Sequence, residues 1–232
     1  MHIPDGFLDP KVATGLFGSA VVVLAYSAAR VRAAATAVAP AMVLATAGKK
    51  AANFALGARR VLTDEGERTI YKMGMVAALV FAAQMFNFPI GSGTSGHLIG
   101  GVFAAVILGP FAGSIVIAAV LVVQSFFFAD GGLLALGANI INMALFGAII
   151  GYYIYNFLKK AGPEWLAIVI AAWLSVPLAA FACALELGIS DTIPFAVVIP
   201  AMVKVHLVIG IAEGLITLAL VGLFHSMLTE KR

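Results

Sequence analysis

The sequence predicts an all-α membrane protein, a single bundle of about seven transmembrane helices. Of its 232 residues, 62% are hydrophobic and 11% are charged, whereas a soluble domain carries about 25% charged residues. The mean hydropathy is +1.08. Divided into apolar spans of about 20 residues, the whole chain, 1–232, makes one integral-membrane domain in a lipid bilayer. A net charge of +3 is too small to indicate nucleic-acid binding.

The apolar runs place the expected spans along the chain. Turn and breaker residues separate them, among them Gly109-Pro110, where a short third span meets the fourth. The expected spans are residues 12–29, 73–88, 98–108, 111–128, 133–158, 165–187 and 195–224.

The connection between the first two spans has a different composition. Residues 33–47 are apolar but contain Pro40, and they are shorter than the roughly 17 residues that a crossing needs. We expect them to be interfacial or re-entrant. Basic residues follow as far as Lys72, interrupted by an acidic turn at 64–67. Residues 33–72 are therefore predicted to form a basic cytoplasmic loop.

The distribution of charge predicts the orientation. With seven spans, twelve of the fourteen Lys and Arg residues fall on one side of the membrane, and the positive-inside rule makes that side cytoplasmic. The amino terminus is then outside and the carboxyl terminus cytoplasmic. The twelve are residues 30, 32, 49, 50, 59, 60, 68, 72, 159, 160, 231 and 232.

Met1-His2 is the first candidate for metal chemistry. No signal-peptide pattern precedes it, and the large second residue favours retention of Met1, so we expect a free α-amine. The amine and the His2 amide nitrogen close a five-membered ring on a metal ion, and the amide and His2 Nδ1 close a six-membered ring. Such planar nitrogen sets suit Ni²⁺ or Cu²⁺ better than Mg²⁺ or Ca²⁺. The alternative is that Met-His is an ordinary beginning of a chain.

A fourth nitrogen is available from His97, which ends the Gly-rich segment 91–97. The predicted topology puts this segment on the same outer face as His2. Irregular backbone at membrane depth is tolerated where protein buries it or where it lines a cavity. His97 alone could equally cap a helix or pack in the core. Together with His2, its interpretation as a metal ligand is favoured.

Four other polar residues are candidates for holding these ligands in place. Asp130 could orient an imidazole, but Asp-Gly-Gly is also an ordinary turn. Asn139 is expected to hydrogen-bond between helices. His206 and Glu213 lie seven positions apart on one helix face, which favours a structural or ligand-orienting pair over direct metal ligation. The lone Cys183 excludes a disulfide or a thiolate cluster within the chain.

Several motifs recur together in one known family. They are Met1-His2-Ile3-Pro4-Asp5-Gly6-Phe7-Leu8, Gly93-Thr94-Ser95-Gly96-His97-Leu98, Asp130-Gly131-Gly132 followed by Leu136-Gly137-Ala138-Asn139, and His206 with Glu213-Gly214. With them, nearly the whole chain resembles the CbiM/NikM family, the substrate-binding membrane subunits of energy-coupling-factor (ECF) transporters for cobalt and nickel.

The resemblance implies a function and a set of partners. Met1, His2 and His97 would hold Co²⁺ or Ni²⁺, which is the transported substrate and not a catalytic cofactor. The chain itself is then not an enzyme, and it has no GxxxxGK[ST] motif for ATP. A membrane coupling subunit, two ATP-binding-cassette ATPases and a small accessory membrane subunit would complete the transporter in the prokaryotic plasma (inner) membrane. Cobalamin biosynthesis would use the cobalt.

The choice between the two metals stays open. A planar set of four nitrogens favours Ni²⁺, and so does the usual order of affinities. Usage within the family leans slightly toward cobalt.

One enzymatic alternative follows from a shorter motif. Gly93-Thr94-Ser95-Gly96 matches the GxSG nucleophile pattern of an intramembrane serine protease, with His206 as the base. This interpretation leaves Met1-His2 without a role.

Overall fold

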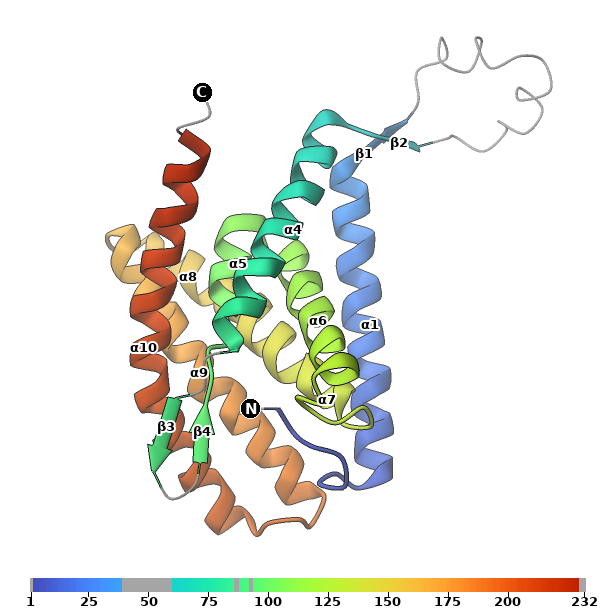
Figure 1. Cartoon of the computed structure of the whole chain (residues 1–232), viewed down its shortest axis with the longest axis vertical. Helices are drawn as coiled ribbons and strands as arrows, with labels where there is room; N and C mark the ends of the chain where they lie inside the picture. The colour runs from blue at the N-terminus through green and yellow to red at the C-terminus, as the bar shows by residue number, and fades with distance from the viewer. Residues whose placement is uncertain (1, 39–59, 86–87, 92–93, 230–232) are drawn as a thin grey trace, which may run out of the picture.

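The described residues form a bundle of seven helical segments, and the last helix runs the length of the bundle and finishes at the end opposite the amino-terminal segment (Figure 1). The structure, a computed structural model, describes residues 2–38, 60–85, 88–91 and 94–229. Two two-stranded antiparallel sheets accompany the helices. The segments are α1 (Pro10–Ala35), α4 (Asp64–Gln84), α5 (Gly101–Leu108), α6 (Pro110–Phe127), the continuous run of α7 (Leu136–Ile140), η1 (Ile141–Ile150) and α8 (Gly151–Lys159), then α9 (Glu164–Ile189) and α10 (Phe195–Thr229); the strands are β1 (Thr36–Val38), β2 (Arg60–Leu62), β3 (Phe88–Gly91) and β4 (Thr94–Gly96).

Local capping fixes where α1 begins. The Asp9 carboxylate accepts a hydrogen bond from Lys11 N at 2.8 Å, and Pro10 takes the first helical position. Both features favour a helix start, because the cap supplies an acceptor and proline needs none. Residues 2–9 therefore stay outside the helix and are free to pack elsewhere.

The connection between the first two helices is shorter than predicted. α1 continues through residues 33–35, and β1 pairs with β2 before α4 begins at Asp64. Residues 39–59, which hold most of the expected interfacial segment, lie outside the described part of the chain.

The acidic stretch at 64–67 is helix and not a turn, so the prediction there was wrong. Thr63 Oγ1 accepts a hydrogen bond from Gly66 N at 3.0 Å and caps α4, whose first turn carries three acidic residues. Acidic side chains are favourable at the positive end of a helix. The second helix thus starts at Asp64, nine positions before the apolar run.

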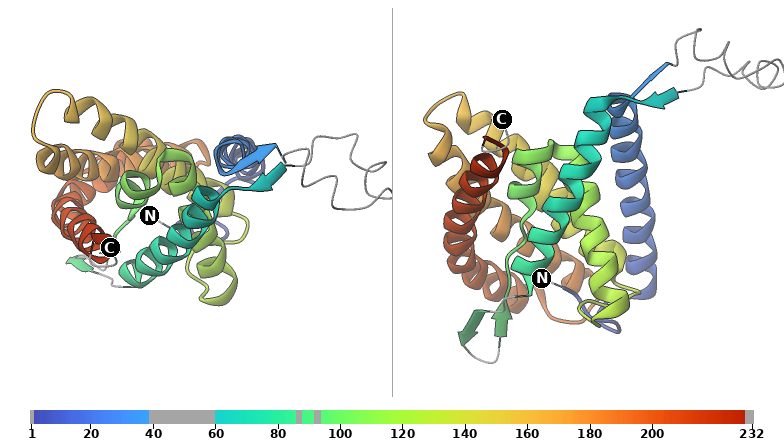
Figure 2. Two further views of the ribbon diagram at one scale, coloured as in Figure 1. Left: turned by 90° about the horizontal axis from the view of Figure 1, so that it is seen from above. Right: turned by 45° about the horizontal axis from the view of Figure 1, so that its top comes forward.

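The short helix α5 is the centre of the bundle (Figure 2). It packs against α4, α6, η1, α8, α9 and α10, and Val102, Phe103, Ala104 and Ala105 are completely buried. A helix that is apolar all round is expected to be buried in this way. Its eight residues rise only about 12 Å, so the run 98–108 does not form a complete helical span.

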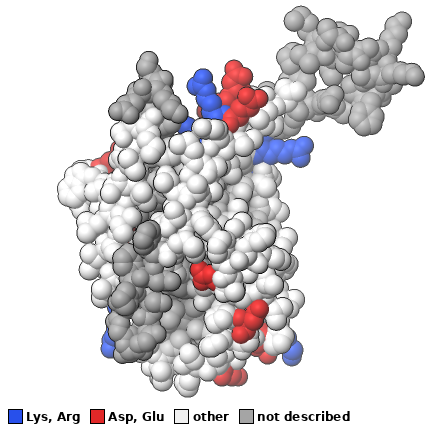
Figure 3. Space-filling model, viewed as in Figure 1, with Lys and Arg blue, Asp and Glu red and all other residues white. Residues whose placement is uncertain are grey.

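Five described segments are long and apolar enough to cross a membrane: α1, α6, α7 to α8, α9 and α10. The fold is therefore the predicted helical bundle with several spans, while seven full crossings stay a prediction. On the face in Figure 3, charged side chains gather toward the two ends of the molecule and the surface between them is almost uncharged. Which end faces the outside also stays a prediction.

Candidate functional site

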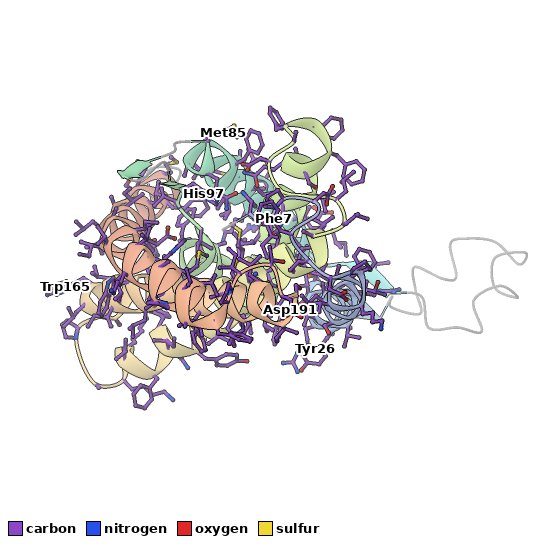
Figure 4. The ribbon with its side chains drawn as sticks, turned by 90° about the horizontal axis from the view of Figure 1, so that it is seen from below. Phe7, Tyr26, Met85, His97, Trp165 and Asp191 are labelled. Atoms are coloured by element: carbon purple, nitrogen blue, oxygen red, sulfur yellow. The ribbon has the colours of Figure 1, made fainter. Side chains whose placement is uncertain are left out.

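The structure brings the imidazoles of His2 and His97 together. Their ring centroids lie 4.5 Å apart, and the ring planes are inclined by 22°. The His2 side chain is only 6% exposed. In Figure 4, seen from the amino-terminal end, His97 lies among the helices, whereas Tyr26 and Trp165 lie at the periphery. Two of the three predicted metal ligands are thus neighbours, and the third, Met1, lies outside the described residues.

The amino-terminal segment is held by reciprocal hydrogen bonds to Asn139. Ile3 N donates to Asn139 Oδ1 at 2.8 Å, and Asn139 Nδ2 donates back to Ile3 O at 3.2 Å. Gly132 N also donates to Ile3 O, at 2.9 Å. The Ile3 side chain is 2% exposed and packs in an apolar cluster with Ala135, Ala138, Cys183, Ala184, Leu187 and Val198. The residue after His2 is therefore fixed by both its backbone and its side chain.

The Asp130-Gly131-Gly132 loop receives this segment. The Asp5 carboxylate accepts hydrogen bonds from Leu133 N and Leu134 N, at 3.2 and 2.8 Å. A Cβ atom at Gly132 would lie 2.2 Å from Asp5 Oδ1, so no other residue fits there without displacing the segment. Gly131 has a φ of +88°, which also favours glycine. The two glycines allow the close approach, and the loop is more than a simple turn.

Asp130 faces His2. Its Oδ1 lies 2.9 Å from His2 Nδ1, close enough for an ion pair, although the two atoms do not align as a hydrogen bond. The His2 imidazole beside it lowers the pKa of the Asp130 carboxyl, which therefore stays ionised at neutral pH. A carboxylate at this distance favours a proton on Nδ1. Because a protonated nitrogen cannot bind a metal, an ion that uses Nδ1 has to displace this contact.

His97 is oriented by its own backbone. Its Nδ1 lies 2.8 Å from Leu98 O, so Nδ1 carries the proton and Nε2 keeps the lone pair. Burial, followed by the neighbouring positive charge of the amino-terminal segment, holds the pKa of His97 well below the usual value. The imidazole is thus neutral at physiological pH, which is the form that binds a metal.

The other predicted residues divide into two groups. Asp130 and Asn139 touch the amino-terminal segment, and Glu213 binds the backbone two and three residues after His97. His206 instead forms a bond within α10, from Nδ1 to Met202 O at 2.7 Å. Among the described residues, no group of three His, Cys, Asp or Glu side chains is placed to hold a metal ion.

Sequence reasoning missed the part played by Asp5 and Gln84. Asp5 anchors the segment to the loop at 133–134, and Gln84 Nε2 donates to Ile99 O at 2.7 Å. A glutamine at the end of an apolar helix was a usable signal, because a buried amide needs a partner. Asp5 in a turn-forming dipeptide gave no such signal.

The comparisons with known proteins give a family match. Residues 34–230 match the family model CbiM, described as "Cobalt uptake substrate-specific transmembrane region".

The chain belongs to the CbiM family.

Curated relatives of this CbiM-family chain are named as metal transport proteins. A putative fused nickel transport protein NikMN of Archaeoglobus fulgidus is 37% identical over 96% of this chain and 64% of its own length. A putative metal transport protein of Haloquadratum walsbyi is 37% identical over 94% of this chain and 86% of its own. The chain thus spans slightly less than two thirds of the first relative and most of the second.

A solved structure shares the fold. The crystal structure of a truncated transition metal transporter superposes with a TM-score of 0.76 at 31% identity, covering 98% of this chain and 99% of that one. The CbiM-family chain is therefore an integral membrane protein of a cobalt and nickel transport family. These relatives do not favour the alternative of an intramembrane protease with Ser95 as nucleophile. The Ser95 side chain is not among the side chains that the structure describes.

Proposed function

We propose that this chain captures Co²⁺ or Ni²⁺ at the outer face of the membrane. The ion is held by the Met1 amine, the His2 amide and imidazole nitrogens, and the His97 imidazole. The observation that supports this most is the stacked pair of His2 and His97, held by a segment that Asn139 and Asp5 bind into the bundle.

The chemistry of the donors fits either ion. Imidazole and deprotonated amide nitrogens suit first-row transition metals, and a planar set of four favours Ni²⁺. His97 Nε2 is the nitrogen offered on the loop side, because Nδ1 faces Leu98 O. The family model is described by cobalt uptake, and the relative from Archaeoglobus fulgidus is named for nickel transport. The proposal therefore keeps both ions as substrates.

Transport then requires partners. We infer that the chain is the substrate-specific subunit of an ATP-driven ECF transporter in a prokaryotic inner membrane. A membrane coupling subunit and two ATPases would supply ATP hydrolysis, since this sequence has no P-loop motif. A small accessory membrane subunit would complete the complex. The basic connection between α1 and α4 would lie in the cytoplasm.

Calorimetry with the purified protein tests the site. Loss of a group that only orients a metal ligand weakens binding by roughly 10- to 100-fold. His2→Ala and His97→Ala should each weaken Co²⁺ and Ni²⁺ binding by more than this, because each removes a ligand. His225→Ala is the control, because this residue lies near the far end of α10, where its Nδ1 approaches Val221 O. Equal loss of affinity in all three folded variants would contradict both the site and the predicted topology.

A further inference from the structure

The backbone that follows His97 is held from two sides by buried polar side chains. Glu213 Oε2 accepts a hydrogen bond from Ile99 N, and Glu213 Oε1 accepts one from Gly100 N, both at 2.8 Å. From α4, Gln84 Nε2 donates to Ile99 O at 2.7 Å. Glu213 and Gln84 are each 1% exposed. The Ile99 peptide is thus bound at both its N–H and its carbonyl group.

These hydrogen bonds lie at the start of α5, where backbone N–H groups lack acceptors within the helix. Gly100 has a φ of +69° and caps α5, whose first N–H groups have no partner within the helix. Gly100 itself has no side chain to cap them. The Glu213 carboxyl group offers one oxygen to each of two N–H groups. A Cβ atom at Gly100 would lie 3.1 Å from the Val80 side chain, so this position favours glycine.

We propose that Glu213 is a positioning residue for the metal ligand His97. By binding Ile99 N and Gly100 N, it sets the place at which the chain enters α5 and hence where the imidazole meets His2. The inference rests on the proposed function, because Glu213 affects metal affinity only by way of the ligand His97. Gln84 assists from the opposite side of the same peptide.

Glu186 is a matched comparison within the same bundle. It is also buried, at 6% exposure, but its hydrogen bond is to a side chain, Asn142 Nδ2 at 2.7 Å, and not to the His97 loop. A glutamine at 186 can still accept that bond. A glutamine at 213 has only one acceptor oxygen, and its NH₂ group would face an N–H donor. The two Glu→Gln changes therefore have equal chemistry but different expected effects.

The test is a double-mutant cycle. Glu213→Gln and Glu186→Gln are made in the wild-type chain and in the His97→Ala chain, and Co²⁺ and Ni²⁺ affinities are measured by calorimetry with absorption spectra of the loaded proteins. Glu213→Gln should weaken binding about tenfold or more in the wild type. Its spectrum should shift toward that of His97→Ala. In the His97→Ala background it should have no further effect, because a group that acts through His97 has nothing left to position. Glu186→Gln should change affinity less than twofold in either background.

Several outcomes would overturn the proposal. One is an equal effect of the two Glu→Gln changes, and another is a further loss of affinity when Glu213→Gln is added to His97→Ala. If His97→Ala alone binds as tightly as the wild type, the proposed metal site is wrong and the inference falls with it. If Glu213→Gln does not fold, Gln84→Met takes its place in the same cycle, because it removes the hydrogen bond to Ile99 O. The proposal then requires that Gln84→Met weakens binding in the wild type and has no further effect in the His97→Ala chain; a further loss there would contradict it.

Discussion

The two ends of the bundle are built by different kinds of polar contact. At the amino-terminal end, side chains bind partners far away in the sequence: Ile3 with Asn139, Asp5 with Leu134, and Glu213 with Ile99, at separations of 136, 129 and 114 residues. At the opposite end the separations are shorter: Lys159 with Glu164, Thr36 with Arg32, Gly66 with Thr63 and Thr63 with Ala35, at 5, 4, 3 and 28 residues. Bonds over long separations fix distant segments relative to one another, which a binding site requires. The bonds over three to five residues act within one helix end or one turn.

The largest effect expected from this difference is on the pH dependence of metal affinity. Binding must displace protons from the amino-terminal amine and from any ligand imidazole that is protonated. The lowered pKa of His97 keeps that ligand neutral, and the lowered pKa of Asp130 keeps its carboxylate ionised beside His2 Nδ1. As the pH falls, affinity should decrease by up to about tenfold per pH unit for each ligand that becomes protonated.

Calorimetry between pH 5 and 8, with proton release recorded in parallel, checks this expectation. The sign follows from protons and metal competing for the same lone pairs. Carboxylate ligands would give little change until about pH 5, since they titrate near 4. Constant affinity over the whole range, or no proton release at pH 7, would contradict a nitrogen site.

A smaller effect is expected from Asn139→Ala, which removes a contact of the amino-terminal end without touching a ligand. It leaves the buried Ile3 N without its acceptor, a loss of about 1–3 kcal/mol in the free energy of unfolding. Metal affinity should fall together with this stability, because residue 3 no longer holds residue 2 in place.

The matched control is Asn142→Ala, three positions further along the same helical run, where the amide binds Glu186. It should lower the thermal midpoint to a similar extent and leave metal affinity near that of the wild type. If both variants lose affinity equally, the contact of Asn139 with Ile3 has no special part in binding.

Much of this contrast could not be predicted from the sequence. Composition and apolar runs predicted the bundle, and chelate chemistry with the Gly-rich segment predicted that His2 and His97 would meet. The reciprocal pairing of Ile3 with Asn139 was not predictable, because no local pattern relates residues so far apart. The π-helix η1 follows no hydrophobic period either. The α4 start could have been found, since Thr63 followed by acidic residues is a helix-start signal.

The smallest effect is expected at the opposite end. Lys159→Ala removes an ion pair with Glu164 at 2.6 Å, but the two side chains are 44% and 53% exposed. Solvent screens such pairs, so the free energy of unfolding should change by no more than about 1 kcal/mol. Affinity for Co²⁺ and Ni²⁺ should stay the same by calorimetry. A clear loss of affinity would show that the two ends are not independent.

The most direct test of the central claim is an amino-terminal extension that a protease can remove. If the α-amine of Met1 is a ligand, one added residue abolishes high-affinity binding of Co²⁺ and Ni²⁺, because it turns the amine into an amide and breaks the spacing to His2. Calorimetry on the folded, extended protein should show no high-affinity site, and cleavage back to Met1 should restore it. Wild-type affinity with the extension still in place would contradict the account.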